Sequence, residues 1–453
     1  MASDVILALG LLLTTASQLR VPGLPVGPGE ICLAIWILLM LFRETGRFGP
    51  PLSRALSRLL IFWSVFAVAQ SLGTLTALVI GDRHDPGLFL HDVMAYPLLA
   101  AVSCLSVVEP GAASRMNRVA WIMTTLGNFF LALQLTVAWN LLPTSLIDPW
   151  YWDRLRGWSQ NPSQLALLCV VLVFVSLHLA DVATRPATRI AAAACIMLPI
   201  YVGRLTQADT FSLVLVAAGP IFLAGKFRIW LISAQRRLTL RSAAAWIVVL
   251  GMPILVISAI PLGSVIAFQA DGLVKELAKN GGKEAGQEAQ LRLETWENAL
   301  ARGLEAAMLG LGPGPHLEIP QSLVAARRVE KSPDFIEHPE ANSTPNFEAH
   351  NTLLDLFLQG GLLADLSFIW LLAASIRSTL RARNAGLTTL LLGVCIYGLF
   401  TLIIRHPICW FAISLCLLAE PETQSKPLLP ASARSALPPE ARREGVRLAE
   451  AGS

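Results

Sequence analysis

Charged residues are scarce in this chain. Asp, Glu, Lys and Arg make up only 15% of its 453 residues, whereas hydrophobic residues make up 54%. A water-soluble domain of this size could not cover so much apolar material with polar surface, so that class is excluded. Three apolar runs, Leu59 to Ile80, Val119 to Leu142 and Ala243 to Phe268, each exceed the roughly 20 residues that span a bilayer. The sequence therefore predicts an integral membrane protein.

Cysteine is absent from the long hydrophilic segment 270–351, because all seven cysteines lie in apolar stretches. We interpret them as small buried hydrophobic residues, which argues against a disulfide framework or a cysteine metal site. The first residues lack a basic segment and a small-residue cleavage site. Val5 to Ala16 is therefore expected to be a retained helix rather than a signal peptide.

Twelve apolar segments are expected to cross the membrane. They are residues 5–18, 30–42, 59–80, 94–108, 119–142, 164–180, 189–203, 208–224, 243–269, 352–375, 386–404 and 406–419. If the N-terminus is cytoplasmic, sixteen Lys and Arg residues fall in cytoplasmic loops and six in the short external loops. This positive-inside bias predicts an all-α polytopic protein of the bacterial inner membrane with about 12 transmembrane helices and both termini in the cytoplasm.

The hydrophilic segment 270–351 lies between the ninth and tenth predicted spans and is expected to carry the chemistry. Apolar residues near helical spacing predict a helix at 288–308, which ends where the run Gly310-Leu-Gly-Pro-Gly-Pro315 forces a turn. The predicted organisation is helices 1–9 in residues 1–269, a mainly helical periplasmic loop domain in 270–351, helices 10–12 in 352–420, and a disordered cytoplasmic tail in 421–453.

Four motifs follow one another along the chain: Arg156-Gly-Trp-Ser-Gln-Asn161-Pro162, Arg292-Leu-Glu-Thr-Trp296, Gly310-x-Gly312-x-Gly314, and His350-Asn351-Thr-Leu-Leu followed by Gly360-Gly361. In this order they resemble the O-antigen ligase and O-antigen polymerase superfamily of bacterial envelope glycosyltransferases. The resemblance implies a GT-C-like membrane fold and transfer of a glycan from undecaprenyl diphosphate to an acceptor hydroxyl, without a cofactor. It makes Trp296 and Asn351 candidate substrate-binding residues.

The resemblance leaves the acceptor open. O-antigen ligation to lipid A-core is the first hypothesis, and repeat-unit polymerisation on a growing glycan is the alternative; transfer to a protein would use the same motifs. Membrane lipids are expected partners and nucleic acid is not. A twelve-helix secondary transporter is a further alternative from another class, but the sequence shows no inverted repeat with paired broken helices.

A departing diphosphate needs positive charge from either a metal or guanidinium groups. The external loops contain no Asp-x-Asp pair and no His/Asp cluster at metal spacing, so no metal is expected. Four arginines are predicted at the external membrane edge and can bind phosphate oxygens bidentately: Arg156, Arg204, Arg292 and Arg405. Arg292 lies in a family motif and is the catalytic candidate. The alternative is that such arginines only anchor helices.

His350 is the candidate general base. It precedes a predicted helix that Asn351 or Thr352 could cap, and the helix dipole would keep its imidazole neutral and ready to accept a hydroxyl proton. A histidine satisfied by the backbone is the alternative. Glu348 could orient His350 or be solvated.

Two other loop histidines, His316 and His338, are expected at the surface. Asn161 and Pro162 are expected to cap and begin the helix 164–180, with sugar contact by Asn161 as the alternative.

Asp209 stands where many family members carry an arginine. An acidic residue at a membrane edge is costly unless it is paired or hydrated. We therefore hypothesise that Asp209 pairs with Arg405, and that Arg405 or Arg204 supplies the missing charge.

Overall fold

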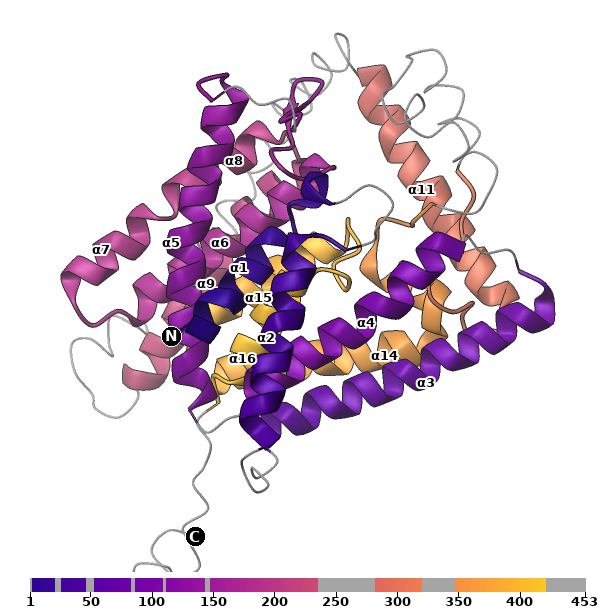
Figure 1. The fold of residues 1–453 in the computed structure, drawn as a ribbon, viewed down its shortest axis with the longest axis horizontal. Coiled ribbons are helices and arrows are strands. Elements are labelled where there is room, and N and C mark those ends of the chain that lie inside the picture. Colours follow the sequence, from indigo (N-terminus) through magenta and orange to yellow (C-terminus); the bar gives the residue numbers. More distant parts are fainter. Residues whose placement is uncertain are drawn as a thin grey trace, which may run out of the picture. The chain divides into compact units, whose positions relative to one another are not determined.

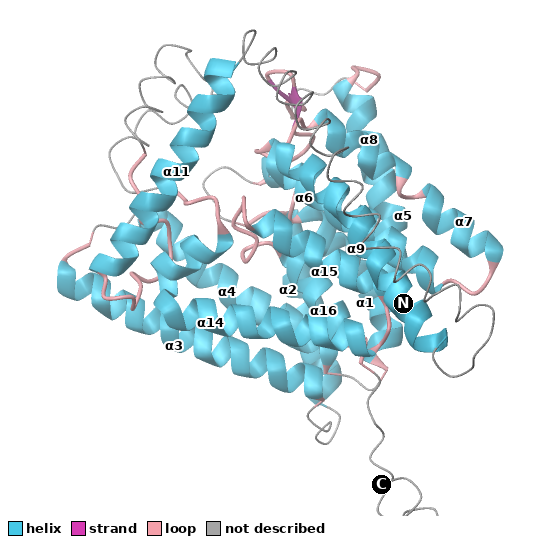
Figure 2. Cartoon of the chain, turned by 180° about the vertical axis from the view of Figure 1, so that it is seen from behind, coloured by secondary structure: helices cyan, strands magenta, loops and turns pink. Residues whose placement is uncertain are grey.

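The computed structural model describes residues 2–20, 26–45, 53–82, 86–108, 111–142, 147–234, 282–319 and 347–420 (Figure 1). Its helices are α1 (Ala2–Leu13), α2 (Pro28–Thr45), α3 (Arg54–Ile80), α4 (Pro86–Val107), α5 (Ala112–Ala138), α6 (Pro162–Val182), α7 (Pro186–Ala194), α8 (Met197–Leu205), α9 (Asp209–Ala234), α11 (Gly282–Glu305), α14 (Thr352–Arg381), α15 (Ala385–Gly398) and α16 (Pro407–Leu417). A 3-10 turn, η1 (Ser17–Leu19), and the paired strands β1 (Trp150–Tyr151) and β2 (Arg154–Leu155) complete the regular structure of the described residues (Figure 2).

The prediction of an all-α membrane protein is confirmed. Seven spans in the described part of the chain are long and apolar enough to cross a membrane: α3, α4, α5, α6, α7 with α8, α9 and α14. The helices α1, α15 and α16 are apolar but shorter. Helices occur at eleven of the twelve predicted spans. The segment 243–269 and the tail 421–453 lie outside the described residues, so the total of twelve spans stays a prediction.

Several spans differ from their predicted form. The span predicted at 189–203 is two short helices, α7 and α8, separated at Cys195 and Ile196. The span predicted at 386–404 ends at Gly398. Thr352 of α14 supports the irregular chain that follows Gly398, because its hydroxyl donates to Thr401 O at 2.6 Å and accepts from Ile403 N at 3.1 Å. Non-helical backbone at membrane depth requires such partners.

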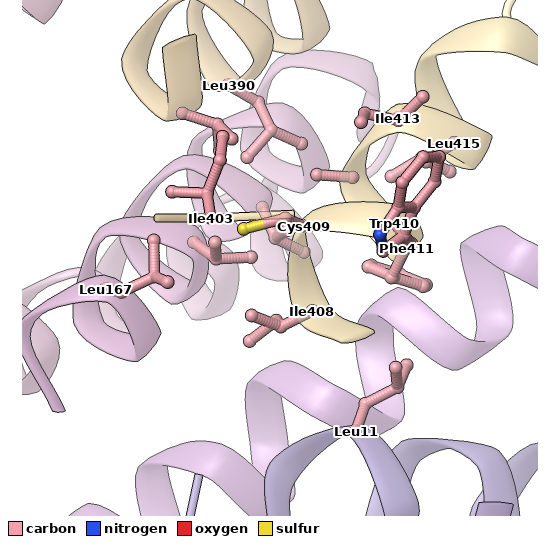
Figure 3. Packing of buried hydrophobic residues seen from close by; sticks show 14 of the residues in the cluster. Leu11, Leu167, Leu390, Ile403, Ile408, Cys409, Trp410, Phe411, Ile413 and Leu415 are labelled. Atoms are coloured by element: carbon pink, nitrogen blue, oxygen red, sulfur yellow. The ribbon is translucent and has the colours of Figure 1, made fainter. Parts of the chain in front are cut away.

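The hydrophobic core runs between most of these helices. Residues of α16 are buried along its whole length and meet side chains labelled on three other helices, Leu11 of α1, Leu167 of α6 and Leu390 of α15 (Figure 3). Trp410 of α16 also packs against Trp63 of α3, with ring centroids 4.4 Å apart. All seven cysteines are unpaired thiols in this apolar material; three are buried and four are partly buried.

Helix α14 is broken at Gly361, whose φ of 63° and ψ of −163° are accessible essentially to glycine alone. The glycine-rich turn after α11 enters this break. Three hydrogen bonds join the two segments: Leu311 N to Leu358 O (2.7 Å), Gly312 N to Gln359 O (2.8 Å) and Leu362 N to Met308 O (3.0 Å). The turn thus satisfies backbone groups that the break leaves without helical partners.

There is no room for a side chain where these backbones cross. A Cβ at Gly361 would meet Met308 O and lie 2.6 Å from Leu309 C, and one at Gly310 would lie 2.6 Å from Gly361 N. A Cβ at Gly73 of α3 would lie 2.6 Å from Gly312 N. The motif predicted as a simple turn is therefore a packed crossing of α3, α14 and the segment after α11, and it fixes that segment beside the start of α14.

Contacts between helix ends fall into two groups. One group joins the end of α3 to α11 through Asp82 and Arg302, and joins the hairpin to the α8–α9 turn through Asp153 and Gln207. The other joins the start of α3 to the end of α14 through Arg58 and Ser378 (2.8 Å), and the end of α6 to α9 through Asp181 and Lys226. In the predicted topology, the helix ends of the first group lie on one side of the membrane and those of the second group lie on the other. Which group faces the periplasm stays a prediction.

Candidate functional site

The turn that carries His350 is held by the first residues of α14. Asp355, which is buried, accepts hydrogen bonds from Ala349 N (2.7 Å) and Asn351 N (3.3 Å). Asn351 caps α14 by accepting from Leu353 N at 3.0 Å and from Leu354 N at 3.3 Å, as predicted. His350 lies between these anchors with a left-handed φ of 51°, and its side chain is exposed. The fold therefore presents the imidazole on a backbone turn that is fixed on both sides.

Helix α11 is bonded directly to this turn. The indole Nε1 of Trp296 donates to Ala349 O at 3.0 Å, and the Trp296 ring lies 6.4 Å from the ring of Phe400. Arg292 precedes Trp296 by four residues and so lies on the same side of α11, one turn away. Ala299 packs beside Ala349 in a small buried cluster. The structure thus brings the segments of Arg292, Trp296 and His350 together.

Arg405, in the loop before α16, lies close to the His350 turn among acidic residues. Its guanidinium forms ion pairs with Glu348 and with Asp92 of α4, the latter at 2.5 Å. The predicted pairing with Asp209 is wrong, because Asp209 is exposed at the start of α9 and Arg405 is occupied by these two carboxylates. Glu348, considered above as a partner of His350 or of solvent, is instead a partner of Arg405.

The electrostatics of this group follow from burial and from its opposite charges. Burial lowers the pKa of Arg405, but the carboxylates of Glu348 and Asp92 outweigh it and raise that pKa above its usual range. Burial lowers the pKa of the neighbouring His406 to about 4, so this imidazole is neutral at pH 7. Asp92 also accepts from Gly314 N at 3.0 Å. Asp92 therefore links the glycine-rich turn to Arg405.

A polar pair on two spans borders the same region. Tyr96 of α4 donates its hydroxyl to Gln359 Oε1 of α14 at 2.5 Å, and both side chains are buried. The carbonyl of Gln359 accepts from the glycine-rich turn. Thus α4, α14, the glycine-rich turn and the turn of His350 form one hydrogen-bonded assembly.

The other predicted site residues, Arg156, Arg204 and Asn161, lie elsewhere, around the hairpin formed by β1 and β2. Arg156 donates to the Asp148 carboxylate at 2.9 Å, and exposed Arg204 donates to Ser212 at 2.6 Å. Asn161 caps α6, accepting from Ser163 N at 2.9 Å, with Pro162 in the first turn, as predicted. The four arginines therefore do not form one cluster: Arg292 and Arg405 flank the His350 turn, whereas Arg156 and Arg204 flank the hairpin.

His316 is buried, so the prediction that it lies at the surface is wrong. Its side chain has 0% exposure and lies between Gly312 O (2.8 Å from Nε2) and the carboxylate of Asp82 (3.3 Å from Nδ1). Asp82 also pairs with Arg302 of α11. Burial raises the pKa of Asp82, but the hydrogen bonds from His316 and Arg302 outweigh this and lower it. This group fastens α11 to the end of α3. His338 lies outside the described residues.

Sequence reasoning missed Asp92, Tyr96 and His406 as members of this assembly. Asp92 and Tyr96 lie in an apolar stretch of the sequence. A carboxylate there is costly unless it is paired, so Asp92 could have been recognised as a residue that needs a cationic partner. Among the described residues, no group of three or more His, Cys, Asp or Glu side chains is placed to hold a metal ion.

Comparison with known proteins gives one match. No curated protein and no solved structure matches the chain significantly. The family model described as O-antigen ligase matches residues 192–369, from α7 to the middle of α14. The matched range contains Arg204, Arg292, the glycine-rich turn and His350, and leaves Arg156 and Arg405 outside. The match over residues 192–369 supports the predicted resemblance to the O-antigen ligase and O-antigen polymerase superfamily.

Proposed function

We propose that this protein transfers a glycan from undecaprenyl diphosphate to a hydroxyl group of lipid A-core, at the periplasmic face of the bacterial inner membrane. The family match indicates an O-antigen ligase type of glycan-transferring membrane enzyme. The observation that carries the finer proposal is the hydrogen bond from Trp296 to Ala349, because it joins the helix of Arg292 to the turn of His350. It supports the proposal because the segments that carry Arg292 and His350 are bonded to each other beside the ends of membrane spans.

In the proposed step, the acceptor hydroxyl oxygen attacks the anomeric carbon of the donor sugar. The bond from that carbon to the phosphate oxygen breaks, and undecaprenyl diphosphate leaves with the electron pair. His350 takes the hydroxyl proton through a ring nitrogen. His350 is suited to this role because it is exposed while its backbone is fixed by Asp355 and Asn351. Asp355 thus acts as a positioning residue, since its carboxylate holds the peptide groups on both sides of His350.

Arg292 meets the developing charge of the leaving diphosphate in this proposal. A guanidinium can bind two phosphate oxygens at once and needs no proton transfer to do so. Arg405 is less suited to direct binding, because Asp92 and Glu348 already neutralise it. We assign Arg405 to positioning: it holds Glu348, two residues before His350. Exposed Arg204 remains available to a substrate, and Arg156 is engaged by Asp148.

The assay uses purified protein in proteoliposomes, an undecaprenyl-diphosphate-linked glycan and lipid A-core, with and without a chelator. The proposal expects glycan-capped core in both conditions, and it fails for this acceptor if core is never modified. Products that grow by repeat units without core would show the alternative, polymerisation. Loss of transfer on chelation would contradict charge neutralisation by arginine. Arg204→Lys, at an exposed residue of α8, serves as a variant that preserves charge.

A further inference from the structure

Helix α11 has three distinct faces. Thr295, Ala299 and Gly303, four residues apart, face the protein: Ala299 is fully buried, and a Cβ at Gly303 would collide with the Phe357 ring. Glu294, Asn298 and Glu305 are exposed and polar. Leu293, Leu300 and Leu304 form a third face at spacings of seven and four residues, with exposures of 57%, 49% and 50%. A helix in water beside a protein needs only the first two faces.

The leucine face is continuous with surface that belongs to membrane spans. Ala306 packs with Ala77 of α3, and Arg302 pairs with Asp82 just beyond the end of α3. The neighbouring α3 side chains Leu78 and Val79 are 71% and 86% exposed. Because α3 is a membrane span by length and composition, this exposed apolar surface is its lipid-facing side.

The same continuity holds toward α14. Met308, which follows α11, accepts a hydrogen bond from Leu362 N at 3.0 Å. Met308, Leu362 and Leu366 are 47%, 47% and 55% exposed. The apolar face of α11 therefore borders the outward sides of two spans. In Figures 1 and 2, the C-terminal end of α11 meets the end of α3, and the rest of the helix leads away from it.

We propose that α11 lies in the membrane interface, with Leu293, Leu300 and Leu304 inserted among the acyl chains of the leaflet on the His350 side. The protein face, the polar face and the leucine face then contact protein, water and lipid respectively. In this arrangement the polar face of Glu294, Asn298 and Glu305 is left to water, while the apolar face enters the acyl boundary, as in an interfacial helix. Trp296 lies between the protein face and the lipid face, and Arg292 lies on the protein face, one turn before it.

This inference does not depend on the reaction, so it is tested without an activity assay. An environment-sensitive fluorescent amino acid is placed at Leu300 in one variant and at Asn298 in the other, two residues apart on opposite faces. Each full-length protein is reconstituted in phosphatidylcholine vesicles, with and without phosphatidylcholine that carries a doxyl quencher near the headgroup end of its acyl chain. Correct folding is checked by a single peak in gel filtration.

The proposal expects several-fold stronger quenching by doxyl lipid at position 300 than at position 298, together with blue-shifted emission at 300. Equal and weak quenching at both positions would overturn it, because the leucine face would then be in water. Blue-shifted emission at 300 without lipid quenching would also overturn it, because protein, either this chain or a second copy, would then cover the face. The substitution Leu304→Glu should reduce quenching at position 300, whereas Glu305→Gln should not.

Discussion

Replacing Gly361 by alanine tests the backbone crossing that positions the site. The residue has φ 63° and ψ −163°, and its Cβ would collide with Met308 O. Holding alanine in this conformation costs about 1–3 kcal/mol. If the crossing opens instead, three backbone hydrogen bonds are lost at about 1 kcal/mol each. The fold is therefore destabilised by about 1–3 kcal/mol, and the collision with Met308 O displaces the glycine-rich turn from α14.

The assay for Gly361→Ala is thermal unfolding in detergent or nanodiscs, combined with glycan transfer at a temperature where the variant is folded. We expect a lower unfolding temperature and reduced transfer. Gly219→Ala is the matched control, because a Cβ at Gly219 of α9 meets no atom within 4 Å. The control should be neutral or slightly stabilised, by up to about 1 kcal/mol. The reasoning is refuted if Gly361→Ala unfolds and transfers like Gly219→Ala.

Three further predictions concern the assembly around His350. Arg405→Ala leaves two carboxylates without their cation and should lower the free energy of unfolding by about 3–5 kcal/mol. Arg405→Lys should be less harmful. Unfolding measurements that rank the two variants equally would contradict the ion-pair assignment. Because burial lowers the pKa of His406 from 6.5 to about 4, the stability due to its neutral state is complete above pH 6.5 and is lost as pH falls toward 4. His406→Asn should remove this part of the pH dependence of the unfolding temperature between pH 7 and 5, and an unchanged slope would count against it. Asp355→Asn should lower kcat more than it raises KM, because the turn of His350 loses an ionic hydrogen-bond acceptor worth about 1.5–3 kcal/mol. If Asp355 had a purely structural role, the substitution would lower stability without lowering kcat more than it raises KM.

Local sequence patterns predicted a large part of the fold. Apolar length gave the helices, and the capping roles of Asn161 and Asn351 could be predicted because a cap and its helix are adjacent in the chain. The glycines at 310–314 indicated a turn correctly. Their second role, packing against Gly73 and Gly361, depends on segments far apart in sequence and could not be inferred from spacing.

The electrostatic partners of the site were the least predictable part. The sequence pointed to Asp209 as the partner of Arg405, because Asp209 stands where many family members carry an arginine. The actual partners, Asp92 and Glu348, are brought together by the packing of α4 and α14 around the loop before α16. His316 appeared solvated because its surroundings are hydrophilic in sequence, but the turn at Gly312 and the end of α3 cover it.

The most direct measurement is glycan transfer by purified His350→Ala and Arg292→Ala protein, with donor binding measured in the same preparations. We predict that His350→Ala loses at least about 100-fold in transfer rate while it still binds undecaprenyl-diphosphate glycan, as expected for a missing general base. Arg292→Ala should lose transfer as well, with weaker donor binding. Wild-type rates from a folded His350→Ala protein would contradict the proposed chemistry.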